Sequence, residues 1–313
     1  MTYTNLINNT IKIYLAGDYK KAYAYITKYE KDVTGNLAQI YNFRYAIASK
    51  AGMADKAIEL MAEAIIDCGF WYASEYLQSD EDLDLIRKNE TFDSLVCICE
   101  KREKVAKNQI KPQLKILSSQ LSESHPEKQL IMALHGNQEN LKIAESYWKC
   151  LLTEERLIAL PQSSEIEFSD AYIWEDLEIG SHILEDFYKK IVRKEMIKKD
   201  ELIYGGFSAG ARQVLYQVLF TQLKAKGLIL IAPWLPELEE WKKIFSLLSE
   251  KRIKIYIICG DKDEDSYEDS KALAGLLNTF DIDHRFVVIE NLEHDYPNEF
   301  SRIIEKGIQY INA

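Results

Sequence analysis

Positive charge is scarce in this chain of 313 residues. There are 39 Lys and Arg residues against 50 Asp and Glu residues, which gives a net charge of -11 at pH 7. An acidic surface gains neither counterion release nor Coulomb attraction from nucleic acid or from an anionic membrane. The composition therefore argues against nucleic-acid partners and otherwise describes an ordinary soluble globular protein.

Long apolar runs are also missing. No run approaches the ~20 apolar residues that a helix needs to cross a bilayer, and the first residues show no basic segment followed by an apolar core. We expect a cytoplasmic protein without membrane insertion.

Cysteine is sparse and odd in number, at Cys68, Cys97, Cys99, Cys150 and Cys259. Most of these residues lie within apolar stretches, which favours buried free thiols over disulfides. Cys97 and Cys99 form a C-x-C pair with no further Cys or His at zinc spacing, so the indication of a metal site is weak. We expect neither a metal ion nor a cofactor.

Helical periodicity fills the chain from its first residue to about Lys107, where apolar residues recur at spacings of three and four. Two glycines, Gly17 and Gly52, lie 35 residues apart, and each is followed after five residues by an alanine, Ala22 and Ala57. That spacing is near the period of a helical-hairpin repeat. The glycine would occupy the turn, and the alanine would let the second helix approach the first closely.

A third helical unit follows, and we place a boundary near Pro112, so that residues 1–110 form an all-α region. Its turns resemble those of tetratricopeptide repeats, although the tryptophan and the C-terminal proline of the full consensus are absent. Because a few hairpins cannot bury their own ends, we expect this region to pack on the rest of the chain, where it would restrict the substrate, or to bind another subunit or protein.

Short β-branched runs alternate with amphipathic helical patterns in residues 111–313. The runs are QLKIL (113–117), QLIMAL (129–134), RLIAL (156–160), LIYGGF (202–207), GLILIA (227–232), IKIYIICG (253–260) and HRFVVIE (284–290). This alternation predicts an α/β domain with a mainly parallel, doubly wound sheet. Functional sites in such sheets lie beyond the carboxyl ends of the strands.

One such strand end carries the pentapeptide Gly206-Phe207-Ser208-Ala209-Gly210. G-x-S-x-G between a strand and a helix is typical of a nucleophile elbow, in which a strained turn exposes the serine oxygen. Small residues at a turn can also serve packing alone. The partners of the serine therefore decide between a nucleophile elbow and a turn that serves packing.

The serine needs a base, because its hydroxyl is not ionised near neutral pH. His294 follows the last predicted strand, whereas His284 opens that strand at its wrong end. The base needs a carboxylate that orients its imidazole. The loop after the strand 253–260, which precedes the strand of the histidine, offers three candidates: Asp261, Asp263 and Asp265.

The oxyanion of the reaction needs backbone donors. His135-Gly136-Asn137 ends another predicted strand, so the N–H of Asn137 is one candidate and the N–H of Ala209, after the nucleophile, is the second. We expect His135 to brace this loop rather than to titrate.

With its oxyanion loop, serine, aspartate and histidine in this order, the segment 113–313 resembles the α/β-hydrolase superfamily. The G-x-x-D loop of that family matches Asp263, with Asp261 as the alternative. LHGN, GGFSAG and GDKD are most similar to the uncapped carboxylesterase, phospholipase-like and acyl-thioesterase branch. The resemblance implies an open site, and it matches Trp174 and Asp176 with a W-x-D element near the pocket. Trp234 follows the carboxyl end of a predicted strand, and both tryptophans could line an acyl pocket, although an aromatic residue just beyond a strand more often serves packing.

We therefore predict a serine hydrolase that cleaves small carboxylic esters or thioesters through an acyl-enzyme on Ser208, with His294 and Asp263 as its partners. Two alternatives remain. A small-peptide hydrolase would use the same triad, and a helical-repeat interaction protein could carry a vestigial hydrolase domain.

Overall fold

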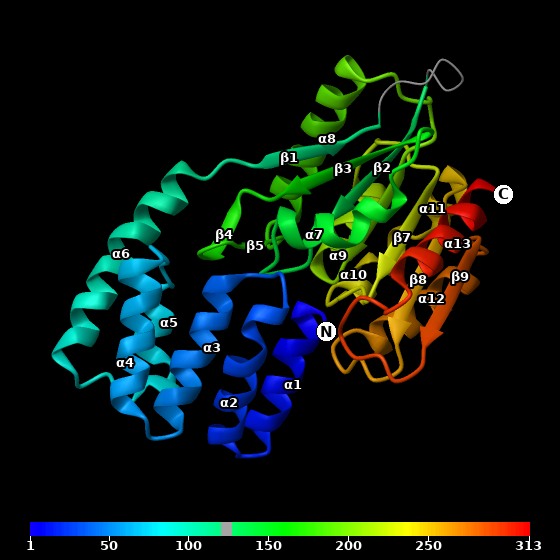
Figure 1. The fold of residues 1–313 in the computed structure, drawn as a ribbon. Helices are drawn as coiled ribbons and strands as arrows, with labels where there is room; N and C mark the ends of the chain where they lie inside the picture. Colours follow the sequence, from blue (N-terminus) through cyan, green and yellow to red (C-terminus); the bar gives the residue numbers. More distant parts are fainter. Residues whose placement is uncertain (120–126) are drawn as a thin grey trace. The chain divides into compact units, whose positions relative to one another are not determined.

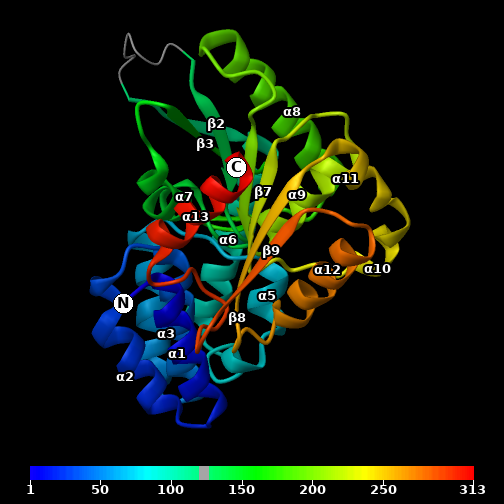
Figure 2. The ribbon, with the colours of Figure 1, turned by 90° about the vertical axis from the view of Figure 1, so that its right-hand side faces the viewer.

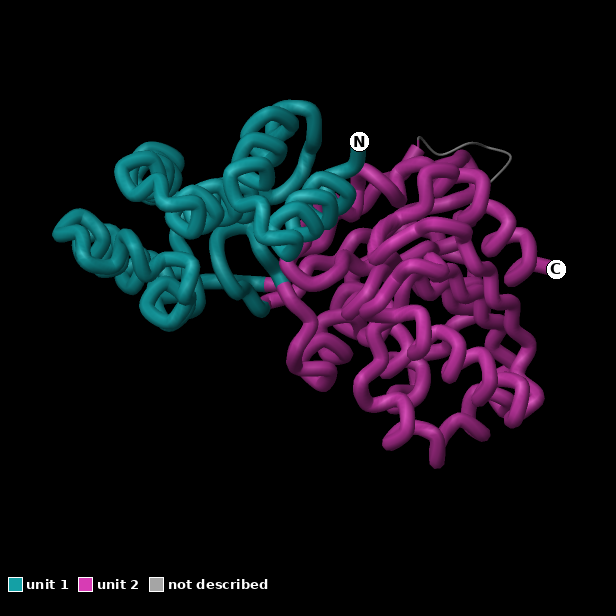
Figure 3. The backbone as a smooth tube through the Cα atoms, turned by 90° about the horizontal axis from the view of Figure 1, so that it is seen from below, with its two compact units in different colours: residues 1–111, 165–172 teal, residues 112–164, 173–313 magenta. Residues whose placement is uncertain are grey.

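The computed structural model describes residues 1–119 and 127–313 and is drawn as a ribbon in Figure 1. The chain forms two compact units, shown in different colours in Figure 3. One unit contains residues 1–111 and 165–172, and the other contains residues 112–164 and 173–313. Within the described ranges, no helix is both long enough and apolar enough to cross a membrane.

Helices make up most of the first unit. They are α1 (Tyr3–Leu15), α2 (Tyr19–Tyr29), α3 (Leu37–Lys50), α4 (Ala54–Ala62), α5 (Ser74–Ser79) and α6 (Glu90–Gln109). The side chains of Thr2, Asp18 and Asn36 cap the first three helices by accepting a hydrogen bond from a backbone N–H of the first turn.

The predicted helical hairpins are present in this unit. Gly17 ends the turn between α1 and α2, Gly52 lies between α3 and α4, and both have φ of +80°, which a side chain would strain. Ala22 and Ala57 are fully buried where the paired helices meet. The likeness to tetratricopeptide repeats in particular stays a prediction.

A β-hairpin from the middle of the chain completes the first unit. It consists of β4 (Glu165–Phe168) and β5 (Ala171–Ile173), of which Ile173 already belongs to the second unit. The N–H of Ser169 donates to the carbonyl of Trp71 (3.1 Å), the N–H of Trp71 donates to Oγ of Ser169 (2.8 Å), and Nδ2 of Asn36 donates to the carbonyl of Ser169 (3.1 Å). The sequence predicts a place in the α/β region for these residues, whereas residues 165–172 join the helical unit. Chain order alone does not show which core a hairpin joins.

The second unit is built on a seven-stranded sheet with the order β1-β3-β2-β6-β7-β8-β9. Its strands are β1 (Gln113–Leu117), β2 (Gln129–Leu134), β3 (Arg156–Gln162), β6 (Ile203–Phe207), β7 (Gly227–Ile231), β8 (Lys254–Gly260) and β9 (His284–Ile289). β1 pairs antiparallel with β3, and the other pairs are parallel. All seven predicted runs are therefore strands, and the prediction of a mainly parallel α/β fold is confirmed.

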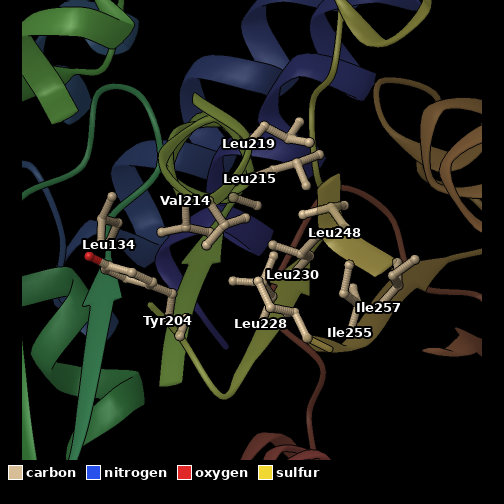
Figure 4. Close-up of a cluster of buried hydrophobic side chains, with 14 of the residues drawn as sticks. Leu134, Tyr204, Val214, Leu215, Leu219, Leu228, Leu230, Leu248, Ile255 and Ile257 are labelled. Atoms are coloured by element: carbon tan, nitrogen blue, oxygen red, sulfur yellow. The ribbon is translucent and has the colours of Figure 1, made fainter. Parts of the chain in front are cut away.

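Helices cover both faces of this sheet, as Figure 2 shows. One face carries α8 (Leu177–Lys194), α9 (Ala209–Phe220), α10 (Leu238–Trp241), α11 (Ser246–Lys251) and α12 (Tyr267–Thr279), and the other carries α7 (Leu141–Trp148) and α13 (Phe300–Asn312). Side chains alternate between the faces along each strand. In β7, Leu228 and Leu230 join the core beside α9 that is drawn in Figure 4, whereas Ile229 and Ile231 pack on the α13 side.

The parallel arrangement brings several loops to one edge of the sheet. β2, β6, β8 and β9 all run in the same direction, so the residues that follow them lie at their common carboxyl edge. Every catalytic and oxyanion residue that we predicted belongs to one of these four loops.

Candidate active site

The turn after β6 holds Ser208 in a strained conformation, with φ of 52° and ψ of -120°. Its N–H donates to the carbonyl of Ile231 at the end of β7 (2.9 Å), which fixes the turn to the neighbouring strand. A Cβ on Gly206 would lie 2.5 Å from the backbone of Gly210, and a Cβ on Gly210 would lie 2.4 Å from the carbonyl oxygen of His135. Both glycines of the pentapeptide are thus required by close backbone approach.

Ser208, His294 and Asp263 lie within hydrogen-bond distance of one another. Nε2 of His294 is 3.0 Å from Oγ of Ser208. Nδ1 of His294 is 3.0 Å and 3.1 Å from the two carboxylate oxygens of Asp263, whose side chain is fully buried. Three loops that are far apart in sequence therefore supply a hydroxyl, an imidazole and a carboxylate in line, which is the geometry of a nucleophile activated by an oriented base.

The acidic loop after β8 distinguishes its three carboxylates. Asp261 accepts the N–H of Asn291 (2.6 Å) with Oδ1, while Asp265 is exposed. Asp263 accepts the N–H groups of Asp265 (3.1 Å) and Ser266 (2.9 Å) on Oδ1 while both of its oxygens face His294. The geometry thus favours Asp263 over Asp261.

Opposing effects act on the imidazole of His294. Burial lowers its pKa, but the hydrogen bond and the negative charge of Asp263, together with the charges of Asp265 and Glu139, outweigh burial and raise the pKa above its ordinary value of 6.5. A raised pKa makes His294 a stronger proton acceptor once it is neutral.

The loop after β2 carries the predicted oxyanion donor Asn137. His135 is fully buried there, and burial lowers its pKa to about 4, so it is neutral near pH 7. Its Nδ1 lies 2.7 Å from the carbonyl of Gly136, and its Nε2 accepts the N–H of Ser163 (3.4 Å). His135 therefore braces the loop, as we expected from the sequence.

Two backbone N–H groups remain unused at this edge. In residues 1–119 and 127–313, the N–H groups of Asn137 and Ala209 have no intramolecular acceptor. Ala209 is also the first residue of α9, where the helix dipole is positive. Both groups are thus available to a substrate oxygen.

The two tryptophans that we predicted to line a pocket have different surroundings. Trp174 is fully buried, its indole N–H donates to the carbonyl of His135 (3.0 Å), and its backbone N–H donates to Oδ1 of Asn137 (3.0 Å). A side chain without accessible surface cannot touch a substrate, so Trp174 supports the oxyanion loop instead. Trp234 is half-buried, with the guanidinium of Arg212 lying 5.1 Å from its ring centre.

Sequence reasoning missed Glu139, which is buried beside the oxyanion loop. One of its carboxylate oxygens accepts the N–H of Gly136 (2.7 Å) and the O–H of Tyr296 (3.2 Å). The only signal in the sequence is an acidic residue two positions after the predicted donor Asn137, in a segment of small and polar residues.

Metal-ligand atoms also gather at the triad. Asp263, Asp265 and His294 offer such atoms within 4.8 Å of one another. Nδ1 of His294 and the carboxylate of Asp263 already share a hydrogen bond, so a metal ion there would compete with the orientation of the imidazole.

Comparison with known families settles the kind of fold that carries this site. A family model for "Phospholipase/Carboxylesterase" matches residues 175–312, and a model for "A/B hydrolase-like, N-terminal domain" matches residues 2–107. Residues 175–312 belong to the phospholipase and carboxylesterase family of α/β-hydrolases. The helical region of the chain is likewise of a kind that accompanies α/β-hydrolase-like domains.

Solved structures resemble this α/β-hydrolase over different lengths. An uncharacterized protein from Bacillus cereus is 42% identical over 100% of both chains, with a TM-score of 0.56. The esterase PE8 is 17% identical over 64% of this chain and 100% of its own, with a TM-score of 0.54. A carboxylesterase from Mesorhizobium loti is 16% identical over 64% of this chain and 96% of its own, with a TM-score of 0.53. A search of the curated proteins finds no match.

Proposed function

We propose that this α/β-hydrolase cleaves small carboxylic esters or thioesters through an acyl-enzyme on Ser208. The observation that carries the proposal is the arrangement of Ser208 on a strained turn, 3.0 Å from Nε2 of His294, whose Nδ1 faces the buried Asp263. A protein that used this domain only for binding would not need an intact, aligned triad, so the arrangement argues against the vestigial alternative.

The reaction follows from these positions. His294 takes the proton of Ser208 as the serine oxygen attacks the acyl carbonyl, and the carboxylate of Asp263 stabilises the imidazolium that forms. The N–H groups of Asn137 and Ala209 donate to the oxyanion. His294 then gives its proton to the leaving alcohol or thiol, and a water molecule activated by the same imidazole releases the acid and restores Ser208.

Ester substrates are favoured by the phospholipase/carboxylesterase model that matches residues 175–312. Besides the two esterases, an acyl-protein thioesterase 2 from Zea mays resembles the chain with a TM-score of 0.51, at 16% identity over 64% of this chain and 99% of its own. These similarities show the fold alone, so the acyl and leaving groups must be measured.

The test is a panel of p-nitrophenyl esters of increasing acyl length, run beside an acyl-CoA thioester and an aminoacyl anilide. We expect the wild type to hydrolyse esters or thioesters and a folded Ser208→Ala variant to lose several orders of magnitude in kcat, because the nucleophile and the base act as a unit. Ser246→Ala, at an exposed serine of α11, is the matched control and should keep full activity.

Two outcomes would count against the proposal. Hydrolysis by a folded Ser208→Ala variant at the wild-type rate would remove the serine mechanism. Cleavage of the anilide alone would show that the triad serves a small-peptide hydrolase.

A further inference from the structure

Glu139 lies between the loop of the oxyanion donors and the loop of the catalytic base. It is only 5% exposed. Its Oε2 accepts one hydrogen bond from the N–H of Gly136 (2.7 Å) and another from the O–H of Tyr296 (3.2 Å). Gly136 precedes the donor Asn137, and Tyr296 follows His294 by two residues, so a single carboxyl group connects the two loops.

Ring stacking holds Tyr296 in place. Its ring stacks on Tyr147, with 3.7 Å between ring centres, and on Phe207, with 4.3 Å between ring centres. The ring of Phe207 lies in turn 4.9 Å from the ring of His294. Tyr296 therefore donates its hydrogen bond from a packed position, and it stacks on Phe207, whose ring lies against the imidazole of His294.

On the other side, Glu139 closes a tight turn. Its own N–H donates to the carbonyl of Gly136 (3.3 Å), and Gln138 within the turn has a positive φ of 60°. The N–H of Gly136 is already bonded to the carboxyl group of Glu139, whereas the N–H of Asn137 has no acceptor within the described ranges. The direction of that N–H depends on how the turn is held.

We infer that Glu139 is a positioning residue of the hydrolase: its carboxyl group holds the turn that presents the N–H of Asn137 to the oxyanion, and through Tyr296 it fixes this turn relative to His294. The inference rests on the proposed function, since the donor acts on an oxyanion only in such a reaction. We assign no contact with the substrate to Glu139.

The charge of Glu139 adds a second effect on the base. Burial raises the pKa of Glu139 to about 7, against the hydrogen bonds from Gly136 and Tyr296, with Asp295 raising it further and His294 lowering it. When ionised, Glu139 contributes to the raised pKa of His294, together with Asp263 and Asp265. Loss of this charge should therefore lower the pKa of His294.

The experiment compares Glu139→Ala with Glu139→Gln in the full chain. Loss of one oxyanion donor costs about 10²–10³ in kcat, and we expect Glu139→Ala, which only misplaces the donor, to lose about 10–100-fold in kcat with little change in KM. Glu139→Gln keeps an acceptor oxygen for Gly136 and should recover most of that kcat. Glu290→Gln, at an exposed carboxylate that follows β9, is the control for the loss of one negative charge.

A second readout does not depend on hydrolysis. NMR titration should give a lower pKa for His294 in Glu139→Gln than in the wild type or in Glu290→Gln. If the wild type hydrolyses no ester or thioester, the proposed function fails, while this titration still tests the connection between Glu139 and the base.

Three results would overturn the inference. They are an unchanged kcat in a folded Glu139→Ala variant, a loss in Glu139→Gln as large as in Glu139→Ala, or an unchanged pKa of His294 in Glu139→Gln. If Glu139→Ala does not fold, Tyr296→Phe replaces it, since it removes one hydrogen bond and keeps the stacked ring. A wild-type kcat for that variant would then contradict the inference.

Discussion

Replacing Asp263 by asparagine tests the orientation of the base with a change of one atom. In the wild type, Oδ1 of Asp263 accepts the backbone N–H groups of Asp265 (3.1 Å) and Ser266 (2.9 Å). These donors will hold the oxygen of an asparagine in the Oδ1 position and leave its NH₂ group in the position of Oδ2. That NH₂ group would then face Nδ1 of His294, where Oδ2 now lies at 3.0 Å.

The consequence is a histidine with the wrong tautomer. A donor at this position favours the imidazole that carries its proton on Nε2, and this form cannot take the proton of Ser208. The same change in a serine protease lowers kcat by about 10⁴, and we expect a loss of about 10³–10⁴ here, which corresponds to about 4–5 kcal/mol of transition-state stabilisation. The fold should persist, because the volume and the backbone hydrogen bonds are kept.

The assay is kcat for a p-nitrophenyl ester near neutral pH, with folding checked by circular dichroism. Asp261→Asn and Asp265→Asn are matched controls on the same loop and should keep kcat within about threefold, since the carboxylate of this loop that is seen to hydrogen-bond to the imidazole is that of Asp263. A folded Asp263→Asn variant with near wild-type kcat would refute the assignment. A severe loss in Asp261→Asn instead would show that the acid lies two residues earlier.

Three further predictions concern pH and stability. Because the pKa of His294 is raised above 6.5 and only the neutral imidazole is a base, kcat/KM should rise with pH through a midpoint above 6.5, and a midpoint below it would contradict the role of Asp263. Gly206→Ala should lower the Tm, because the new Cβ would lie 2.5 Å from backbone atoms and overpacking costs about 1–3 kcal/mol. Gly275→Ala in α12 is the control and should not lower the Tm, because open space surrounds that position. Equal Tm values for Gly206→Ala and the wild type would refute this prediction. Residues 165–172 lose their core when the helical unit is removed. A fragment of residues 112–313 should therefore be more soluble when a Gly-Ser linker replaces residues 165–172 than when they are kept. Equal solubility of the two fragments, checked by gel filtration, would contradict this prediction.

The strands and the loops of the triad could be predicted because their signals are local. Each strand of the main sheet is a short β-branched run, and a parallel order brings the carboxyl ends to one edge whichever helices cover the faces. The turn at Ser208 depends on Gly206 and Gly210, which stand within two residues of it.

The parts that could not be predicted depend on contacts between distant residues. The hairpin of β4 and β5 is short, and its place in the helical unit depends on hydrogen bonds of Ser169 with Trp71 and Asn36, far away in the sequence. Glu139 looks like a surface acid in the sequence, and only the fold buries it against Tyr296, 157 residues later. Likewise, the burial of Trp174 depends on a contact with His135 that no local pattern indicates.

Covalent labelling by a fluorophosphonate probe, followed by peptide mass mapping, tests the central claim most directly. The probe reacts with a serine only when a base activates it, so the label reports the nucleophile without any knowledge of the substrate. We expect one probe per chain, attached to Ser208, and no label on folded Ser208→Ala. An unlabelled wild type, or a label that persists in Ser208→Ala, would contradict the central claim.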